Sequence, residues 1–101
     1  MTTIFHITSR NAWLEATVLG SYSSDTLATE GFTHCSSADQ VQRSARKFFK
    51  GKTDLVLLHI AQASVHPEVR YEAAGSGELF PHIYGPLNLD AVFSIEDFEV
   101  V

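Results

Sequence analysis

The sequence has a single cysteine, few basic residues and no long apolar run, and each shortage excludes a class of protein. With Cys35 alone, the 101-residue chain can form neither an internal disulfide nor a zinc site of several thiolates. Seven Lys and Arg against twelve Asp and Glu give a net charge of −5, which makes nucleic acid an unfavourable partner because phosphate contacts need clustered cations. No apolar run approaches the roughly 20 residues that cross a membrane.

The rest of the composition is that of one small globular domain. Apolar residues make up 45% and charged residues 19%, a balance typical of compact folds. The first residues carry neither the basic nor the apolar region of a secretory signal. We therefore expect a single domain over residues 1–101 of a cytoplasmic protein with no membrane partner. The oligomeric state leaves no mark in the sequence.

Local patterns predict two main helices. The first begins after Ser9, a candidate N-cap, and runs through Val18, with Gly20 just beyond its end. The second is predicted over 37–49, where apolar residues recur with helical spacing. The stripe expected to face the core consists of Val41, Ala45, Phe48 and Phe49.

Strands are predicted mainly in the second half of the chain. One strand is expected early, over 3–8, and residues 21–30 are expected to form an exposed loop because Ser, Thr and Asp are frequent there. The apolar segment 54–60 is expected to be a central strand. The other predicted strands cover 32–35, 69–72, 82–84 and 91–100. This order predicts an α+β fold with a mostly antiparallel sheet.

Two features allow both a structural and a chemical interpretation. Five cations lie in or just after the second half of helix 37–49, where they either complement the helix dipole, which we favour, or bind phosphate. They are Arg43, Arg46, Lys47, Lys50 and Lys52. Cys35 precedes a helix N-terminus, where a thiol can become a nucleophile. Free cysteines are also often buried, and we favour that structural role.

Three segments each place a histidine among hydroxyl-bearing residues, and two of them also contain a glycine or proline. They are centred on His6, His34 and His82. A small core that buried three imidazoles separately would have to satisfy six ring nitrogens with few polar partners. We therefore predict that these histidines, the candidate catalytic residues, line one partly open cleft. The sequence has no motif for a metal site.

The same three segments, in this order and at this spacing, resemble an uncharacterised family, the domain-of-unknown-function family 952, from Ile4 to about Val92. That family in turn resembles the ADP-ribosyltransferase fold, which has a small split antiparallel sheet, helices packed on it and NAD in the cleft. The pattern of a first-strand histidine followed by a hydroxyl residue resembles His6-Ile7-Thr8. His82 takes the late-strand position that often holds a catalytic Glu in that fold.

This resemblance implies NAD or another ADP-ribose-containing, nucleotide-like ligand, with ADP-ribosyl or phosphoryl transfer as the reaction of an active member. His6 would then donate to the ribose or pyrophosphate, and His82 would act as general acid or base. The other implied contacts are Thr8, Ser9 and Ser36 to the amide or ribose hydroxyls, Phe32 or Tyr84 to a ring, and Arg70 to a phosphate. An ion pair with Glu68 or Glu72 is the alternative for Arg70.

Two other functions stay open at this point. The domain can be a non-catalytic binding module whose histidines are held by hydrogen bonds in the core. It can also be a thiol-dependent enzyme in which His34 or another histidine activates Cys35. The positions of the three histidines and the exposure of Cys35 distinguish these alternatives.

Overall fold

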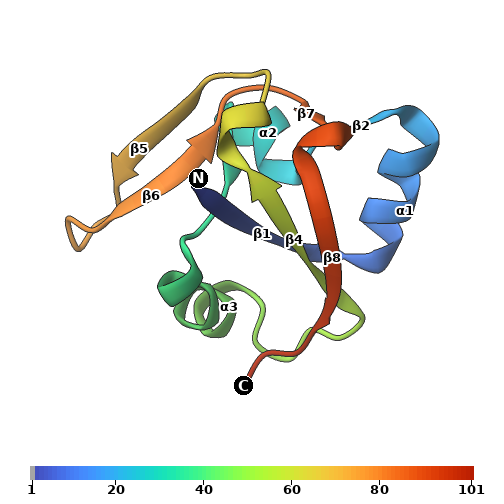
Figure 1. Ribbon diagram of the computed structural model, residues 1–101. Helices are drawn as coiled ribbons and strands as arrows, with labels where there is room; N and C mark the ends of the chain where they lie inside the picture. Colours follow the sequence, from blue (N-terminus) through green and yellow to red (C-terminus); the bar gives the residue numbers. More distant parts are fainter. Residues whose placement is uncertain (1) are drawn as a thin grey trace.

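The fold is organised around a three-stranded antiparallel sheet with β4 (Leu55–Ala61) at its centre (Figure 1). In the computed structural model, which describes residues 2–101, β1 (Thr3–Ser9) and β8 (Val92–Phe98) pair with β4 on either side. The prediction of a central strand over 54–60 is therefore confirmed. β4 is apolar apart from His59, and apolar side chains pack against both of its faces.

Alternate residues of β4 enter two different hydrophobic clusters, as the two-residue period of a strand requires. Val56, Leu58 and Ile60 pack in a cluster that includes residues of α1 (Arg10–Leu19). Leu55 and Leu57 pack in the other, with residues of α3 (Val41–Phe48). The central sheet thus separates two small cores, each closed by one helix.

Two further antiparallel sheets complete the domain. One has the order β3 (Thr33–His34), β6 (Leu79–Ile83), β5 (Val69–Ala73), and the other pairs β2 (Ser21–Tyr22) with β7 (Leu87–Asn88). Strand β6 begins three residues before the predicted strand 82–84. Phe5 of β1 exchanges two backbone hydrogen bonds of 2.8 Å with Ser36, just after β3. This bridge brings the sheet of β3 and β6, which carry His34 and His82, against the central sheet. Every strand pair is antiparallel.

Helix α1 follows the predicted signals closely. The Ser9 hydroxyl accepts a hydrogen bond of 3.0 Å from the backbone N–H of Ala12, which caps the first turn. The helix ends one residue beyond Val18, and Gly20 follows it with a φ of 92°, a left-handed conformation that glycine adopts without strain.

The predicted loop over 21–30 is wrong, because this segment contains β2 and a six-residue helix, α2 (Asp25–Glu30). The Ser24 hydroxyl caps α2 by accepting from the N–H of Leu27 at 3.3 Å, and Gly31 ends the helix. Ser, Thr and Asp favour helix N-termini as well as loops, so composition alone could not separate the two. Tyr22, on β2 at the start of this segment, is buried in the core, which an exposed loop would not allow.

The expected core face of α3 is right at two positions and wrong at a third. Val41 and Ala45 are buried as predicted, whereas the Phe48 side chain is 60% exposed. Phe48 stands in the last turn of α3, and its ring lies 6.5 Å from that of His34 instead of entering the core. The ring of Phe49, one residue later, is the one that packs against the second cluster.

The radius of gyration is 12.6 Å, close to the ~13 Å of a single domain of about 100 residues. The helices within residues 2–101 are all too short or too polar to cross a membrane.

Candidate functional site

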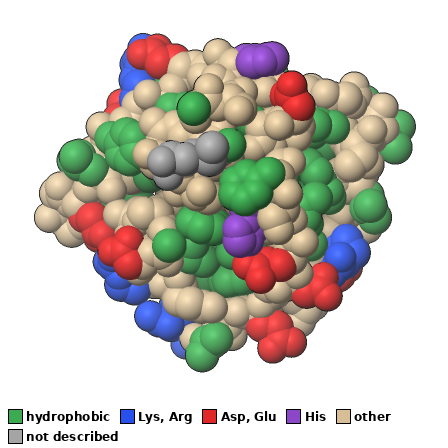
Figure 2. All heavy atoms as spheres, in the orientation of Figure 1, with side chains coloured by type: hydrophobic (Ala, Val, Ile, Leu, Met, Phe, Trp, Pro, Cys, Tyr) green, Lys and Arg blue, Asp and Glu red, His purple; other side chains and the backbone are tan. Residues whose placement is uncertain are grey.

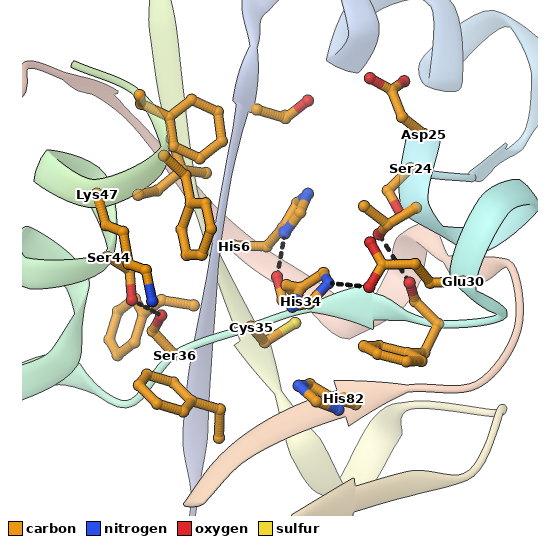
Figure 3. A pocket seen from close by; sticks show the side chains of 18 of the residues that line it. His6, Ser24, Asp25, Glu30, His34, Cys35, Ser36, Ser44, Lys47 and His82 are labelled. Atoms are coloured by element: carbon orange, nitrogen blue, oxygen red, sulfur yellow. Dashed lines mark hydrogen bonds and ion pairs between the residues drawn. The ribbon is translucent and has the colours of Figure 1, made fainter. Parts of the chain in front are cut away.

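A cavity of about 970 Å³ lies among α2, α3, β1 and the hairpin of β5 and β6. Its volume is at the upper end of the range of about 300–1,000 Å³ found for small-molecule sites. His6, His34 and His82, which come from three different strands, all line it (Figure 3). The three segments that the sequence singles out therefore meet at one place.

His34 and His82 come together through strand register. They are direct partners in the antiparallel pairing of β3 and β6, and their ring centroids lie 5.1 Å apart in an edge-on arrangement. The ring of Phe32 stacks on His82 at 4.1 Å with an interplanar angle of 17°, and lies 4.8 Å from His34. Phe32 thus packs against both imidazole rings.

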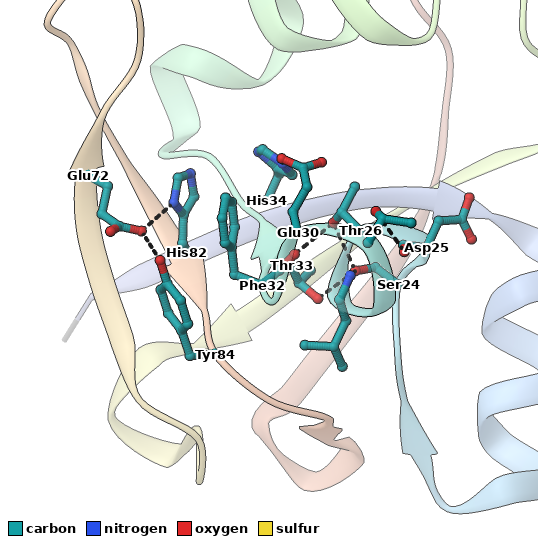
Figure 4. A network of polar contacts seen from close by, with 12 residues as sticks. Ser24, Asp25, Thr26, Glu30, Phe32, Thr33, His34, Glu72, His82 and Tyr84 are labelled. Carbon is teal, nitrogen blue, oxygen red and sulfur yellow. Dashed lines mark hydrogen bonds and ion pairs between the residues drawn. The ribbon is translucent and has the colours of Figure 1, made fainter.

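A carboxylate that the sequence analysis did not assign to the site orients His82. One oxygen of Glu72, on β5, accepts hydrogen bonds from Nδ1 of His82 at 2.8 Å and from the Tyr84 hydroxyl at 2.5 Å (Figure 4). Both hydrogen bonds lower the pKa of Glu72, and the one from Tyr84 has the larger effect. The Glu72 carboxylate can only accept, so Nδ1 of His82 carries the proton of this hydrogen bond and Nε2 is the other ring nitrogen.

Nε2 of His82 has no hydrogen-bond partner within the described part of the chain. A histidine held by a carboxylate at one nitrogen and free at the other has the arrangement of a general base. Antiparallel pairing of segments 69–72 and 82–84 across the Gly-containing turn was the signal that could have placed Glu72 beside His82.

His6 is tied to the protein through both ring nitrogens. Its Nδ1 donates to the backbone carbonyl of His34 at 2.6 Å, and its Nε2 lies 2.8 Å from the Tyr22 hydroxyl. Burial lowers the pKa of His6 to about 4, so the ring is neutral near pH 7. Nε2 of this neutral ring accepts the hydrogen bond from Tyr22, whose oxygen is also 3.0 Å from Oγ1 of Thr8. His6 therefore positions β3 and Tyr22 beside the cavity.

The other predicted ligand contacts divide into two groups. Thr8, Ser9, Ser36 and Phe32 line the cavity. The Ser9 oxygen also caps α1, and the Ser36 hydroxyl donates to Ser44 of α3 at 3.2 Å.

Arg70 and Tyr84 are absent from the cavity wall as described for residues 2–101. Arg70 forms an ion pair of 2.9 Å with Glu68, the alternative considered for it, and its guanidinium lies 4.4 Å from the centroid of the Tyr84 ring. The hydroxyl of Tyr84 donates its hydrogen bond to Glu72.

Three of the five clustered cations line the cavity: Arg43, Lys47 and Lys52. Arg43 forms two hydrogen bonds with the carboxylate of Glu78, at 2.9 and 2.7 Å, and this pairing lowers the pKa of Glu78 to about 2. The opposite wall carries two carboxylates of α2, Asp25 and Glu30. The helix-dipole explanation fits Arg46 and Lys47, which lie in the last turn of α3, but not Arg43, which lies in its first turn.

Cys35 is 3% exposed and belongs to the apolar cluster that contains α1. Burial raises the pKa of its thiol well above the ordinary range, which opposes formation of a thiolate. The thiol-enzyme alternative thus has no support at this position. No three side chains of His, Cys, Asp or Glu among residues 2–101 are arranged to hold a metal ion.

Comparisons with known proteins place this chain in a family. Residues 7–95 match the family model described as "Protein of unknown function (DUF952)". The crystal structure of protein CC0527 from Caulobacter crescentus is similar, with 34% identity over 97% of this chain and 87% of that chain and a TM-score of 0.90. For its solution NMR structure the identity is 35% over 98% and 86%, with a TM-score of 0.83. A comparison with curated proteins found no match. Because these descriptions name no ligand, the resemblance to ADP-ribosyltransferases stays a prediction.

Proposed function

This chain belongs to the DUF952 family, and we propose that its histidine-lined cavity binds NAD or another nucleotide that contains ADP-ribose. The observation that carries the proposal is the meeting of imidazoles, hydroxyls, lysines and an aromatic ring on the wall of one cavity. A nucleotide of this class presents the complementary groups, which are phosphates, ribose hydroxyls and planar rings.

Each part of such a ligand has a suitable partner on the wall. Lys47 and Lys52 carry positive charge for the pyrophosphate, and a lysine ammonium binds phosphate as a point charge. The hydroxyls of Thr8, Ser9 and Ser36 suit the ribose. Exposed Phe48 offers a face for a ring, where stacking contributes about 1–3 kcal/mol by analogy with nucleic-acid bases.

His82 and Glu72 supply what a transfer reaction would need. Nε2 of His82 takes the proton of an acceptor hydroxyl as that oxygen bonds to C1′ of the ribose and the bond from C1′ to nicotinamide breaks. Nicotinamide leaves as a neutral molecule with the electron pair of that bond. Glu72, which already accepts from Nδ1 at 2.8 Å, stabilises the imidazolium that forms. A binding module without chemistry would use the same cavity and release no nicotinamide.

Calorimetric titration of NAD and ADP-ribose tests the proposal on the natural protein, on His82→Ala and on His66→Ala. His66 is exposed and lies outside the cavity, so its variant is the matched control. We expect His66→Ala to bind each compound with the same affinity as the natural protein. We expect His82→Ala to bind each compound at least about tenfold more weakly than the natural protein. Absence of binding by the natural protein, or equal binding by His82→Ala, would contradict the proposal. Assay of free nicotinamide then separates an enzyme from a binding module.

A further inference from the structure

Two pairs of a histidine and a glutamate meet on the wall of the cavity. Nδ1 of His82 bonds to Glu72 at 2.8 Å, and Nε2 of His34 lies 3.2 Å from the carboxylate of Glu30. The two imidazole centroids are 5.1 Å apart, and Phe32 packs against both rings (Figure 4). The transfer step proposed above uses the pair on His82 and gives no role to the pair on His34.

Each pair leaves one ring nitrogen for a ligand. An ionised carboxylate accepts but cannot donate, so each histidine carries a proton on the nitrogen that faces its glutamate. The remaining nitrogens are Nε2 of His82 and Nδ1 of His34, and neither has a hydrogen-bond partner within residues 2–101. A neutral imidazole accepts a proton at that nitrogen, and a protonated one donates from it. Two such rings side by side can therefore supply a base and an acid to one substrate.

The two rings differ in their access to solvent, which assigns the two roles. The His34 side chain is 44% exposed, whereas His82 is 9% exposed and stacked on Phe32. Water can return a proton readily to an exposed imidazole, so His34 suits the acid, whose proton must be replaced in every cycle. His82, which Glu72 holds at Nδ1, suits the base.

A positive charge lies near this histidine pair. The Lys47 ammonium is 5.3 Å from the centroid of Phe48, whose ring in turn lies 6.5 Å from that of His34. Lys47 lines the cavity and forms no ion pair with a carboxylate in the part of the chain that the structure describes. An ammonium group beside a base and an acid favours a phosphate ester, because phosphoryl transfer develops negative charge while one oxygen attacks and another leaves.

The charges of the cavity favour a single nucleotide over a nucleic-acid strand. The chain has a net charge of −5, and Asp25 and Glu30 also line the cavity, where they would repel the phosphates of a strand that passed through. A cyclic diester keeps the leaving oxygen on its own ribose, so one nucleotide carries every atom on which the two imidazoles act. The exposed ring of Phe48 offers a face on which its base can stack.

We propose that His34 and His82 form an acid–base pair that hydrolyses a cyclic phosphodiester of a single nucleotide, such as a nucleoside 2′,3′-cyclic phosphate. Nε2 of His82 takes a proton from water as the water oxygen bonds to phosphorus. The bond from phosphorus to one ribose oxygen breaks, and Nδ1 of protonated His34 gives its proton to that oxygen, which leaves with the electron pair. The product is a nucleoside monophosphate. Exchange of one proton with water at each imidazole restores the pair.

This activity goes beyond the proposed function and uses the same cavity. The test is incubation with adenosine 2′,3′-cyclic phosphate, followed by phosphorus NMR, which resolves the cyclic diester from the monoester product. We expect the natural protein and the control His66→Ala, an exposed position outside the cavity, to hydrolyse it at the same rate. His34→Ala and His82→Ala should each be at least about 100-fold slower.

The dependence of the rate on pH tests the two roles separately from folding. The rate should rise and then fall as pH increases from about 5 to 9, because one imidazole must be neutral while the other is protonated. The titratable groups around the pair are Glu72 of β5, Glu30 of α2, Lys47 of α3 and His6 of β1. His6 stays neutral near pH 7 because burial lowers its pKa to about 4. A rate that changes in one direction only would contradict the acid–base pair.

The outcomes distinguish this activity from nucleotide binding. Absence of hydrolysis by the natural protein, or full activity in either histidine variant, would overturn the acid–base pair and leave the binding of NAD as it stands. Hydrolysis by a protein that binds neither NAD nor ADP-ribose would overturn the proposed function alone. Circular dichroism melting checks the fold of each variant, and His82→Gln, which keeps a polar side chain, replaces His82→Ala if that variant is unfolded.

Discussion

His34 and His82 face each other across β3 and β6 as direct partners, with their ring centroids 5.1 Å apart. A shift of this pairing by one residue would turn one of the two rings to the other face of the sheet. The stacking of Phe32 on His82 depends on this register, whereas the hydrogen bond from His82 to Glu72 depends on the register of β5 and β6. The candidate site is therefore a property of the strand pairing as much as of the histidines.

The buried His6 makes the stability of the protein depend on pH. Its pKa is about 4 in the folded protein and 6.5 in the unfolded chain. Between these values the unfolded chain takes up a proton that the folded protein does not, so the free energy of unfolding falls as pH decreases from 6.5 to 4. The loss from this residue should total about 3 kcal/mol, at about 1.4 kcal/mol for each pH unit.

Urea unfolding at about pH 7, 5.5 and 4 measures this dependence in the natural protein and in His6→Gln. The variant has no group that titrates at this position, so its stability should decrease less steeply over the same interval. Equal slopes for the two proteins would show that His6 titrates normally in the folded state.

Ala45 and Phe48 should respond in opposite ways to polar substitution, although the helical pattern places both on one stripe. Ala45→Asp puts an unpaired charge into a fully buried position and should destabilise the protein by about 3–5 kcal/mol. Phe48→Ser should change stability by less than about 0.5 kcal/mol, because Phe48 is already largely exposed. Denaturant unfolding of the two variants checks both values, and a tolerated Ala45→Asp would mean that α3 does not pack as described.

Cys35 should react slowly with alkylating reagents in the native protein. Its thiol is buried and its pKa is raised by that burial, so both access and thiolate formation are unfavourable. Mass spectrometry after iodoacetamide treatment should show little modification near neutral pH and complete modification in denaturant. Cys35→Ser should retain nucleotide binding. Rapid alkylation of the native protein together with loss of binding would instead restore the thiol-enzyme interpretation.

The hydrogen bond from Tyr84 to Glu72 should be visible in the titration of the tyrosine. Glu72 raises the pKa of Tyr84, mainly through this hydrogen bond and also through its negative charge. Glu72→Gln should therefore lower the pKa of Tyr84, as measured by the ultraviolet absorbance of the phenolate. The variant Tyr84→Phe identifies which transition belongs to this residue. If the transition of Tyr84 does not move in Glu72→Gln, the carboxylate is not bonded to it in solution.

Signals confined to a few neighbouring residues were enough to predict part of this protein. Ser9 and Gly20 mark the ends of α1 because capping depends only on nearby backbone groups. The mostly apolar segment 54–60 indicated the central strand, since a strand covered on both faces is rich in apolar residues. The three histidine segments could be recognised because hydroxyl-bearing residues lie near each histidine in the chain itself.

Tertiary structure decided the features that depend on residues distant in the chain. Glu72 reaches His82 only because the hairpin of β5 and β6 pairs in one register. Phe48 lies at the cavity, away from the core, because its turn of α3 extends to where His34 is placed by another sheet. The separation of Lys47 from Asp25 across one cavity follows from the packing of α3 and α2 around β1. Local propensity specifies where elements begin and end, whereas register and packing bring together side chains that the sequence keeps apart.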